Sequence, residues 1–322
     1  MARGKAVAAL VLVGVVGGGT YLAVRTGVGL LPDPEGCTAT VAGHTTALTT
    51  EQAENASVIA AIAERRGLPA RAVSIAIATA YQESKLENID SGDRDSLGLF
   101  QQRPSQGWGT RAQILDPYYA TNAFYDALVQ VDGYRDLPIT QAAQEVQRSA
   151  FPDAYADHEL DGRTIASALS GYSEAAFSCV VTRDEVGPQT PVGNGLTPRA
   201  NAVRRDLAAS FGGLSLGGFA PGGVTSGHMA GSSHYDGRAI DVFFRPVSAE
   251  NRRRGWVLAH YLVANAARLS LAHVIFDAKI WTAGASSEEG WQQYRPSGLT
   301  GEETAETLVI LKHRDHVHVD VD

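Results

Sequence analysis

Apolar residues recur at helical spacing through the first half of the chain. Val73, Ile77 and Tyr81 are four positions apart, with Ala76 and Ala80 beside them, and so mark the buried face of a helix. Similar patterns, opened by capping residues, predict further helices over residues 49–66, 116–131, 139–149 and 162–170. We therefore expect residues 49–185 to form an all-α domain.

The pattern changes after residues 186–197, where three glycines and two prolines predict a linker. Helices are expected after Thr197 and after Ser248, which are both good N-caps. Short apolar strands are expected between and after these helices, over residues 239–244, 273–277, 279–282 and 316–321. This mixture predicts an α+β domain with a small antiparallel sheet at residues 198–322.

The N-terminus carries an uninterrupted apolar run. Residues 6–24 contain no charge and follow Arg3 and Lys5. Nineteen helical residues nearly span a hydrocarbon core of about 30 Å. The pattern predicts a single-pass membrane anchor within residues 1–25, with the remainder outside the cell and residues 26–48 as a tether. A cleaved signal peptide, giving a secreted protein, is the alternative.

Composition narrows the class of protein. The chain has 322 residues, 44% hydrophobic and 19% charged, as expected of a globular protein long enough for two domains. A net charge of -8 argues against a nucleic-acid partner. Cys37 and Cys179 are the two cysteines. In an exported chain they can pair as one disulfide that closes a long loop, and two separate buried thiols are the alternative.

Two short stretches near the C-terminus carry potential metal ligands. His234 precedes Asp241 by seven positions, and His316 and His318 alternate, so on a strand both imidazoles point to one face. Imidazole, carboxylate and imidazole make a three-ligand set that leaves one position of zinc open, as catalytic sites do. Asp315 is close enough to act as a base there.

The first stretch resembles a known pattern. Ser232, His234, Gly237, Ala239 and Asp241 match S-x-H-x-x-G-x-A-x-D of the lysostaphin, D-alanyl-D-alanine carboxypeptidase and hedgehog group of zinc peptidases. Many peptidases of this group cut the peptides of peptidoglycan. The resemblance therefore implies a zinc peptidase fold and activity for residues 198–322.

The same resemblance assigns roles to individual residues. It implies zinc on His234, Asp241 and His318, with Asp315 as the general base and His316 beside it. Such peptidases often use an upstream arginine to polarise the scissile carbonyl, but residues 225–231 contain none. By position, His228 is the candidate for that role. His313 is expected at the surface.

A second candidate centre lies in the first half of the chain. Glu83 ends an apolar helix directly before the polar loop of residues 86–96. Tyr81, Phe100 and Trp108 are near enough in sequence to desolvate its carboxyl group, and desolvation raises a carboxyl pKa as a general acid requires. A solvated helix-end glutamate is the alternative.

The residues around Glu83 carry a further resemblance. Glu83-Ser84, followed by Gly98, Leu99, Phe100 and Gln101, is similar to the E-S and G-L-x-Q motifs of soluble lytic transglycosylases and goose-type lysozymes. The resemblance implies a lysozyme-like domain in which Glu83 protonates the glycosidic oxygen of peptidoglycan. It implies Ser84 as the support of Glu83, and Gly98 and Gln101 as part of the sugar groove.

Other parts of that family's pattern are less complete. Its third motif is absent as such, and Tyr155 is the candidate for the motif's tyrosine. A hydrolase needs a second carboxylate, for which Asp90, Asp93 and Asp95 in the following loop are the candidates. A transglycosylase needs none, because the sugar's own hydroxyl closes the ring. Both reactions remain open from the sequence.

Both resemblances point to one polymer. The sequence predicts a bifunctional peptidoglycan hydrolase that cuts glycan strands with Glu83 and peptides with zinc. Two alternatives stay open: a non-enzymatic cell-wall binding protein, and a protein in which only the zinc domain is active. The sequence identifies no protein partner.

Overall fold

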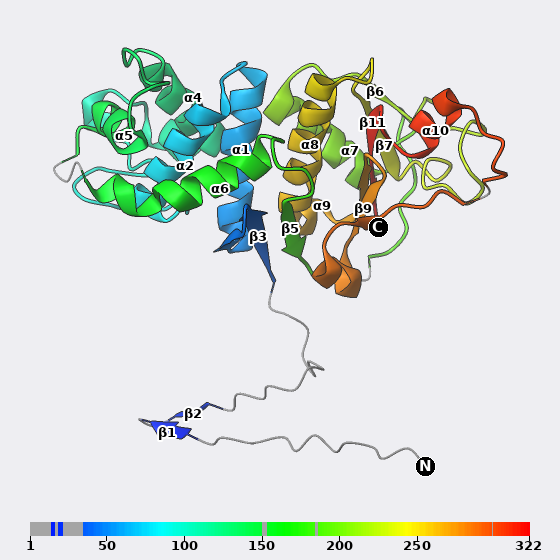
Figure 1. Cartoon of the computed structure of the whole chain (residues 1–322), viewed down its shortest axis with the longest axis horizontal. Coiled ribbons are helices and arrows are strands. Elements are labelled where there is room, and N and C mark those ends of the chain that lie inside the picture. Colours follow the sequence, from blue (N-terminus) through cyan, green and yellow to red (C-terminus); the bar gives the residue numbers. More distant parts are fainter. Residues whose placement is uncertain (1–13, 17–18, 22–34, 150–152, 184–185, 298) are drawn as a thin grey trace. The chain divides into compact units, whose positions relative to one another are not determined.

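The computed structural model describes residues 14–16, 19–21, 35–149, 153–183, 186–297 and 299–322. The chain divides into two units, Met1–Pro34 and Glu35–Asp322. The second unit contains both halves predicted above as separate domains (Figure 1).

The predicted membrane-anchor helix over residues 6–24 is wrong. Its described residues form β1 (Gly14–Val16) and β2 (Gly19–Tyr21), which pair as an antiparallel hairpin. In the described part of the chain, no helix has the length and apolar character needed to cross a membrane. Glycines at four of positions 14–19 weaken a helix here, and the β-branched and aromatic residues between and after them favour a strand. The single-pass localisation that rested on this helix is therefore also wrong, and the other residues of the predicted anchor lie outside the described residues.

The prediction of an all-α first domain is also wrong. A three-stranded antiparallel sheet joins its beginning to its end, in the order β4 (His44–Leu48), β3 (Gly36–Val41), β5 (Phe177–Val180). Ala42 and Gly43, between β3 and β4, both have positive φ, as a two-residue hairpin turn requires. The described part of the predicted tether is thus mainly this hairpin, whose threonines favour the extended chain.

The predicted disulfide is confirmed. Cys37 on β3 and Cys179 on β5 are directly opposite in the sheet and are bonded to each other. They are 142 positions apart in the sequence, so the bond ties the two ends of the helical region together.

We expect the double substitution Cys37→Ser and Cys179→Ser to lower the free energy of unfolding by about 5 kcal/mol, because a loop of this length gains much entropy when it opens. Urea denaturation of the oxidised chain and of the double variant measures the difference. Reduced wild-type protein is the control and should behave as the double variant does. Equal stabilities in all three would contradict the expectation.

Among its described residues, the first half also contains six α-helices. The helix α1 begins at the predicted capping box, in which the side chains of Thr49 and Gln52 each accept a hydrogen bond from the other's backbone N–H. The helices are α1 (Thr50–Arg65), α2 (Ala70–Ser84), α3 (Arg111–Ile114), α4 (Pro117–Leu128), α5 (Ile139–Gln147) and α6 (Glu159–Leu169), with 3-10 turns η1 (Pro104–Gln106) and η2 (Ala154–His158).

The second half is built on a six-stranded antiparallel sheet in the order β10-β9-β8-β11-β7-β6. Its strands are β6 (Leu216–Gly217), β7 (Ala239–Phe243), β8 (Leu271–Phe276), β9 (Lys279–Thr282), β10 (Gln292–Gln293) and β11 (His316–Val321). The helices are α7 (Pro198–Phe211), α8 (Ala249–Ala264), α9 (Ala266–Leu269) and α10 (Ala305–Leu311), with a 3-10 turn η3 (Gly284–Glu289). The predicted caps Thr197 and Ser248 are confirmed.

The central strand β11 is buried along its whole length and pairs with β7 and β8. Its valines, Val317, Val319 and Val321, belong to the hydrophobic core, and α7 and α8 pack against the sheet. Because side chains alternate along a strand, His316 and His318 point to the opposite face. The sheet therefore presents both imidazoles on the side away from the core.

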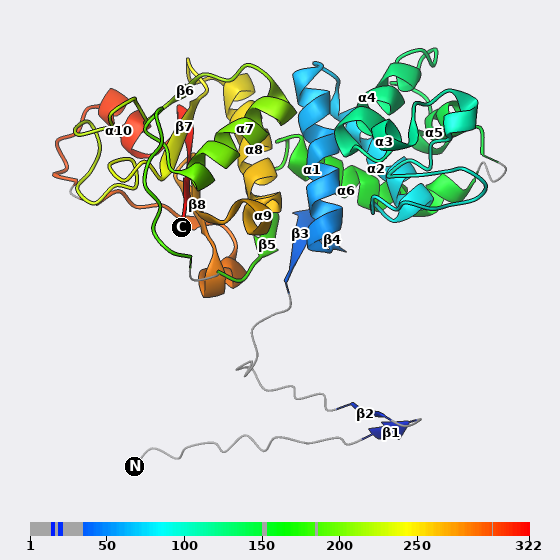
Figure 2. The same cartoon turned by 180° about the vertical axis from the view of Figure 1, so that it is seen from behind.

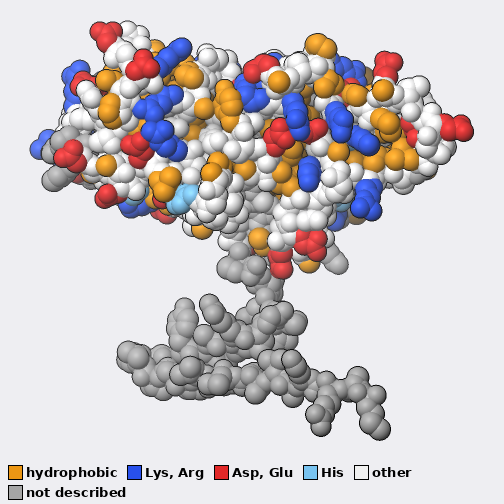
Figure 3. Space-filling view, viewed as in Figure 1, with side chains coloured by type: hydrophobic (Ala, Val, Ile, Leu, Met, Phe, Trp, Pro, Cys, Tyr) orange, Lys and Arg blue, Asp and Glu red, His pale blue; other side chains and the backbone are white. Residues whose placement is uncertain are grey.

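The two halves meet along α1 and α8, which lie side by side in both views (Figures 1 and 2). Glu64 on α1 binds Arg253 and Arg254 on α8, each at 2.9 Å. Asn265 donates a hydrogen bond to Ser57 at 3.0 Å in the buried part of this contact. On the face shown in Figure 3, acidic and basic side chains are interspersed.

His260 on α8 is fully buried at this contact. Its Nδ1 lies 2.8 Å from the carbonyl oxygen of Ala168 on α6 and must donate to it. Its Nε2 has no hydrogen-bond partner among the described residues. Burial lowers the pKa of His260 to about 4, because the imidazolium would lose its hydration.

This histidine should make stability depend on pH. The unfolded chain binds a proton below the usual pKa of 6.5, while the folded chain stays neutral down to about 4. Stability is therefore complete above pH 6.5 and falls as the pH approaches 4, by about 2 kcal/mol between pH 7 and pH 5. The variant His260→Asn keeps a donor for the carbonyl oxygen of Ala168 but does not titrate. Denaturation curves at pH 7 and pH 5 should therefore show that this variant loses about 2 kcal/mol less unfolding free energy than the wild type. If the variant lost as much stability between pH 7 and pH 5 as the wild type, His260 would not be the cause of this pH dependence.

Candidate functional site

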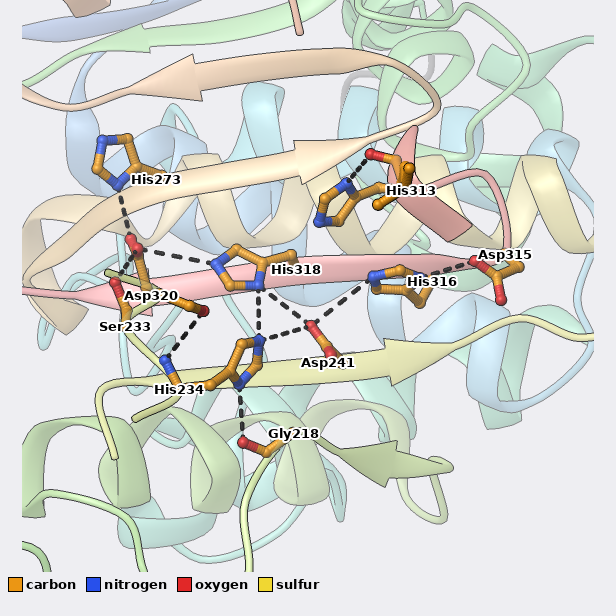
Figure 4. A network of polar contacts seen from close by, with 12 residues as sticks. Gly218, Ser233, His234, Asp241, His273, His313, Asp315, His316, His318 and Asp320 are labelled. Carbon is orange, nitrogen blue, oxygen red and sulfur yellow. Dashed lines mark hydrogen bonds and ion pairs between the residues drawn. The ribbon is translucent and has the colours of Figure 1, made fainter. Parts of the chain in front are cut away.

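The pairing of β7 with β11 brings two of the potential ligands, Asp241 and His318, together. Asp241 lies directly opposite His318 in the register, and His234 comes from the turns that precede β7. All three side chains are buried. His234 Nε2 is 3.1 Å from His318 Nδ1 and 3.2 Å from Asp241 Oδ1, and the latter two atoms are 3.1 Å apart (Figure 4). The three predicted ligands thus form a compact triangle.

The hydrogen bonds of His234 fix which of its nitrogens is free. Its Nδ1 lies 2.7 Å from the carbonyl oxygen of Gly218, which can only accept, so Nδ1 carries the proton. The close approach needs a glycine, because a Cβ at position 218 would lie 2.3 Å from the imidazole of His234. The lone pair of Nε2 therefore points toward His318 and Asp241.

The triangle has the chemistry of a cation site. Two imidazole nitrogens and a carboxylate oxygen converge, and tetrahedral zinc would hold such atoms about 3.3 Å apart. Burial opposes the charged form of His318, but its interactions with Asp241 and Asp320 raise its pKa to about 9. Burial also opposes ionisation of Asp241, yet its close contacts with His234 and His318 hold its pKa far below the usual range. The residues fit zinc.

Two further histidines flank the triangle. The ring of His228 stacks on His234 with centroids 3.9 Å apart, and His228, His234 and Asp241 place ligand atoms within 4.8 Å of one another. Burial, followed by the nearby charge of His234, lowers the pKa of His228. On another side, His316 Nε2 is 3.9 Å from Asp241 Oδ1. Both imidazoles line the same cavity as the three residues of the triangle.

Asp315, the predicted base, makes its closest contacts with its neighbours. Its Oδ1 is 2.7 Å from His316 Nδ1, and its Oδ2 accepts hydrogen bonds from Arg245 at 2.7 Å. Burial opposes ionisation of Asp315, but His316 and Arg245 together lower its pKa to about 2. The carboxylate thus reaches the triangle through the imidazole of His316.

Arg245 is not among the residues predicted from the sequence. The arginine of such peptidases is expected upstream of His234, whereas Arg245 follows β7 and its guanidinium lies 4.2 Å from the ring centroid of Phe243. His313, expected at the surface, has its ring centroid 4.6 Å from that of His316, and burial lowers its pKa to about 3. An Arg-Pro pair directly after a ligand-bearing strand was the available signal for Arg245.

A cavity of about 550 Å³ opens over this cluster. Its polar side carries the histidines and acids described above, together with Arg245. Its apolar side is formed by Phe243, Ile275, Tyr294, Ile310 and Leu311. The cavity can therefore hold a chain with an apolar side group against the triangle.

The second candidate centre surrounds Glu83 at the end of α2. Tyr155, fully buried, donates a hydrogen bond to Glu83 Oε1 at 2.7 Å. Burial and the charge of Glu83 raise the pKa of Tyr155, so this hydroxyl keeps its proton. Ser84 donates to the carbonyl oxygens of Ala80 and Leu99 at 3.0 and 2.8 Å, which ties the helix end to the following loop.

The loop of residues 98–101 lies against that helix end. Gly98 has φ of +70°, and a Cβ there would lie 2.6 Å from the carbonyl oxygen of Ile114. Gln101 lines a cavity of about 510 Å³ together with Glu83, Trp108 and Arg148. A neighbouring cavity of about 940 Å³ is also lined by Trp108 and Arg148.

The aspartates considered as a second carboxylate have other partners. Asp93 lines the cavity but pairs with Arg103 at 2.9 Å. Asp95 binds the backbone N–H and hydroxyl of Ser105 at 2.8 and 3.0 Å. Asp90 lies 3.6 Å from Arg111. Among the described residues that line the cavity with Glu83, no acid other than Asp93 occurs.

A family model matches part of the second half of the chain. The sequence model of the VldE C-terminal domain family matches residues 192–306. The matched region contains His234 and Asp241 and ends before the strand that carries His316 and His318. No curated protein matches the chain. The comparisons match neither the transglycosylase nor the lysostaphin group, so the part of this chain for which a relationship is found resembles the VldE C-terminal domain.

Proposed function

We propose that this protein is a peptidoglycan hydrolase with a zinc-dependent peptidase site and a glycan-cleaving site. The observation that carries the proposal is the convergence of His234, Asp241 and His318 at 3.1 to 3.2 Å beneath a cavity. Three ligands with an open side are typical of catalytic zinc. The cavity lined by Glu83 supports the glycan-cleaving activity. The motif around Glu83 and the motif around His234 both resemble those of enzymes that act on peptidoglycan.

The peptidase site works through a proton relay. When bound, zinc supplies a Lewis acid that polarises a peptide carbonyl and acidifies water. His316, whose Nε2 lies 3.9 Å from Asp241, is placed to accept the proton of the attacking water, and Asp315 would stabilise the resulting imidazolium through Nδ1. Arg245 keeps Asp315 ionised. His316 then returns the proton to the leaving amine. The contacts thus favour His316 as the base, with Asp315 orienting it.

His228 is suited to bind the oxyanion. Its ring borders the open side of the triangle, and its backbone N–H and carbonyl are both held by the hydroxyl of Tyr235. Its imidazole N–H would donate to the developing negative charge, as an oxyanion hole requires. Phe243 and Ile310 on the facing wall would contact an apolar side group of the substrate.

The glycan site needs only one acid. Tyr155 holds Glu83 Oε1, so the proton for the glycosidic oxygen must be carried by Oε2. Asp93 is the one other carboxylate in the described lining, and its ion pair with Arg103 occupies one of its oxygens. This favours transglycosylation, in which the sugar's own hydroxyl attacks, over hydrolysis. Gln101 and Trp108 would contact the sugars.

Digestion of purified cell walls tests the proposal. The full-length chain should clear a wall suspension, and a zinc chelator should stop peptide cleavage while glycan cleavage continues. Binding to walls without any cleavage would overturn the proposal in favour of a non-enzymatic wall-binding protein. Peptide cleavage without glycan cleavage would show that only the zinc site is active.

A further inference from the structure

A buried carboxylate lies behind the metal triangle. Asp320 follows His318 by two positions on β11, and its side chain is 8% exposed. Its Oδ1 accepts a hydrogen bond from His273 Nδ1 at 2.8 Å, and its Oδ2 accepts one from Ser233 Oγ at 2.8 Å. The same Oδ2 lies 3.7 Å from His318 Nε2. Figure 4 shows Asp320 on the side of His318 that faces away from Asp241.

The position of Asp320 decides which nitrogen of His318 is available to a metal. His318 faces His234 and Asp241 with Nδ1 and faces Asp320 with Nε2. A carboxylate on the Nε2 side favours the proton there, and the lone pair then remains on Nδ1. Asp320 itself cannot replace a ligand, because it lies beyond the imidazole and both oxygens already accept hydrogen bonds.

Asp320 also holds the segment that carries the first ligand. Ser233, which donates to Asp320, directly precedes His234 in the chain. His273 is directly opposite Asp320 in the pairing of β8 with β11. One carboxylate therefore connects β8, β11 and the segment before β7, and these last two supply His318 and His234. Because Asp320 holds these three segments together, less free energy is needed to bring the ligands around a cation.

We propose that Asp320 is a positioning residue for the metal, which orients His318 through Nε2 and the His234 segment through Ser233, with His273 holding Asp320 in place. The inference rests on the proposed zinc site. Neither resemblance nor the family match assigns a role to Asp320, His273 or Ser233.

Zinc affinity measured with the full-length chain tests the inference without any assay of activity. Competition against a chromophoric chelator should give Asp320→Asn a zinc affinity about 10- to 100-fold weaker than that of the wild type. Asp277→Asn is the matched control. Asp277 is 11% exposed on the turn between β8 and β9 and pairs with Arg252, so its loss removes a buried charge away from the triangle. Its zinc affinity should equal that of the wild type.

A second pair of variants separates positioning from a general loss of folding. His273 is 34% exposed, so substitution there is tolerated better than at Asp320. His273→Leu should weaken zinc roughly 10-fold, and His273→Asn, which keeps a donor near the place of Nδ1, should restore most of the affinity. The visible absorption of the cobalt-substituted chain should change in Asp320→Asn and in His273→Leu, and not in Asp277→Asn.

The outcomes distinguish this inference from the proposed function. If the wild type binds zinc and both Asp320→Asn and His273→Leu bind it equally well, Asp320 has no positioning role, while the zinc site stands. If the wild type binds no zinc, the zinc site fails and the inference fails with it. Should Asp320→Asn not fold, the two variants of His273 decide alone.

Discussion

Replacing His318 by alanine is expected to remove bound zinc and abolish peptide cleavage. Its Nδ1 is one corner of the triangle, 3.1 Å from both His234 and Asp241, and two ligands cannot close a zinc site. Replacing a residue that only orients a ligand typically weakens metal affinity by about 10- to 100-fold, and the loss of zinc affinity in His318→Ala should be larger. Metal analysis of the purified full-length chain measures it: about one zinc per wild-type chain and none in the variant.

His44→Ala is the control for removing a histidine. His44 pairs with Asp161 in the first half of the chain, so its loss should leave both zinc and peptide cleavage unchanged. The helical first half does not depend on His318, and glycan cleavage should survive in both variants. Peptide cleavage that persists in a folded, zinc-free His318→Ala variant would contradict the proposed mechanism.

The second large effect is expected at Glu83. Glu83→Gln keeps the shape of the side chain and an acceptor for Tyr155 but cannot give up a proton, so glycan cleavage should fall by about 10²- to 10⁴-fold. The release of glycan fragments from purified walls measures this rate. Peptide cleavage should not change, because the proposed zinc ligands lie in the other half of the chain.

A matched variant tests the part that Tyr155 plays. Tyr155→Phe removes only the hydroxyl that holds Glu83 Oε1, and we expect a smaller loss than in Glu83→Gln. Asp93→Asn tests the choice between the two reactions, since a hydrolase that used Asp93 would lose its activity. Full glycan cleavage in Glu83→Gln would show that another group supplies the proton.

Local patterns predicted much of the second half of the chain. The caps at Thr197 and Ser248 and the strand over residues 316–321 follow from side chains near one another in sequence. The triangle was foreseen because alternation on β11 and the spacing from His234 to Asp241 are also local properties. The roles of these residues stay predictions until metal and cleavage are measured.

The incorrect and missing predictions have physical causes. The hairpin of β3 and β4 depends on its pairing with β5, which is distant in sequence, and its Ala-Gly turn is a weak local signal. The length and hydrophobicity of the apolar N-terminal run predict a membrane helix, although its glycines disfavour one. Arg245 and Asp320 act through contacts that only the folded sheet creates, so residue spacing could not reveal them.

Product analysis tests the central claim most directly. Purified walls would be digested with the full-length chain, Glu83→Gln and His318→Ala, and the soluble products identified by mass spectrometry. The account predicts new glycan ends and new peptide ends with the wild type, only peptide ends with Glu83→Gln, and only glycan ends with His318→Ala. Walls that the wild type leaves without either kind of new end would contradict it.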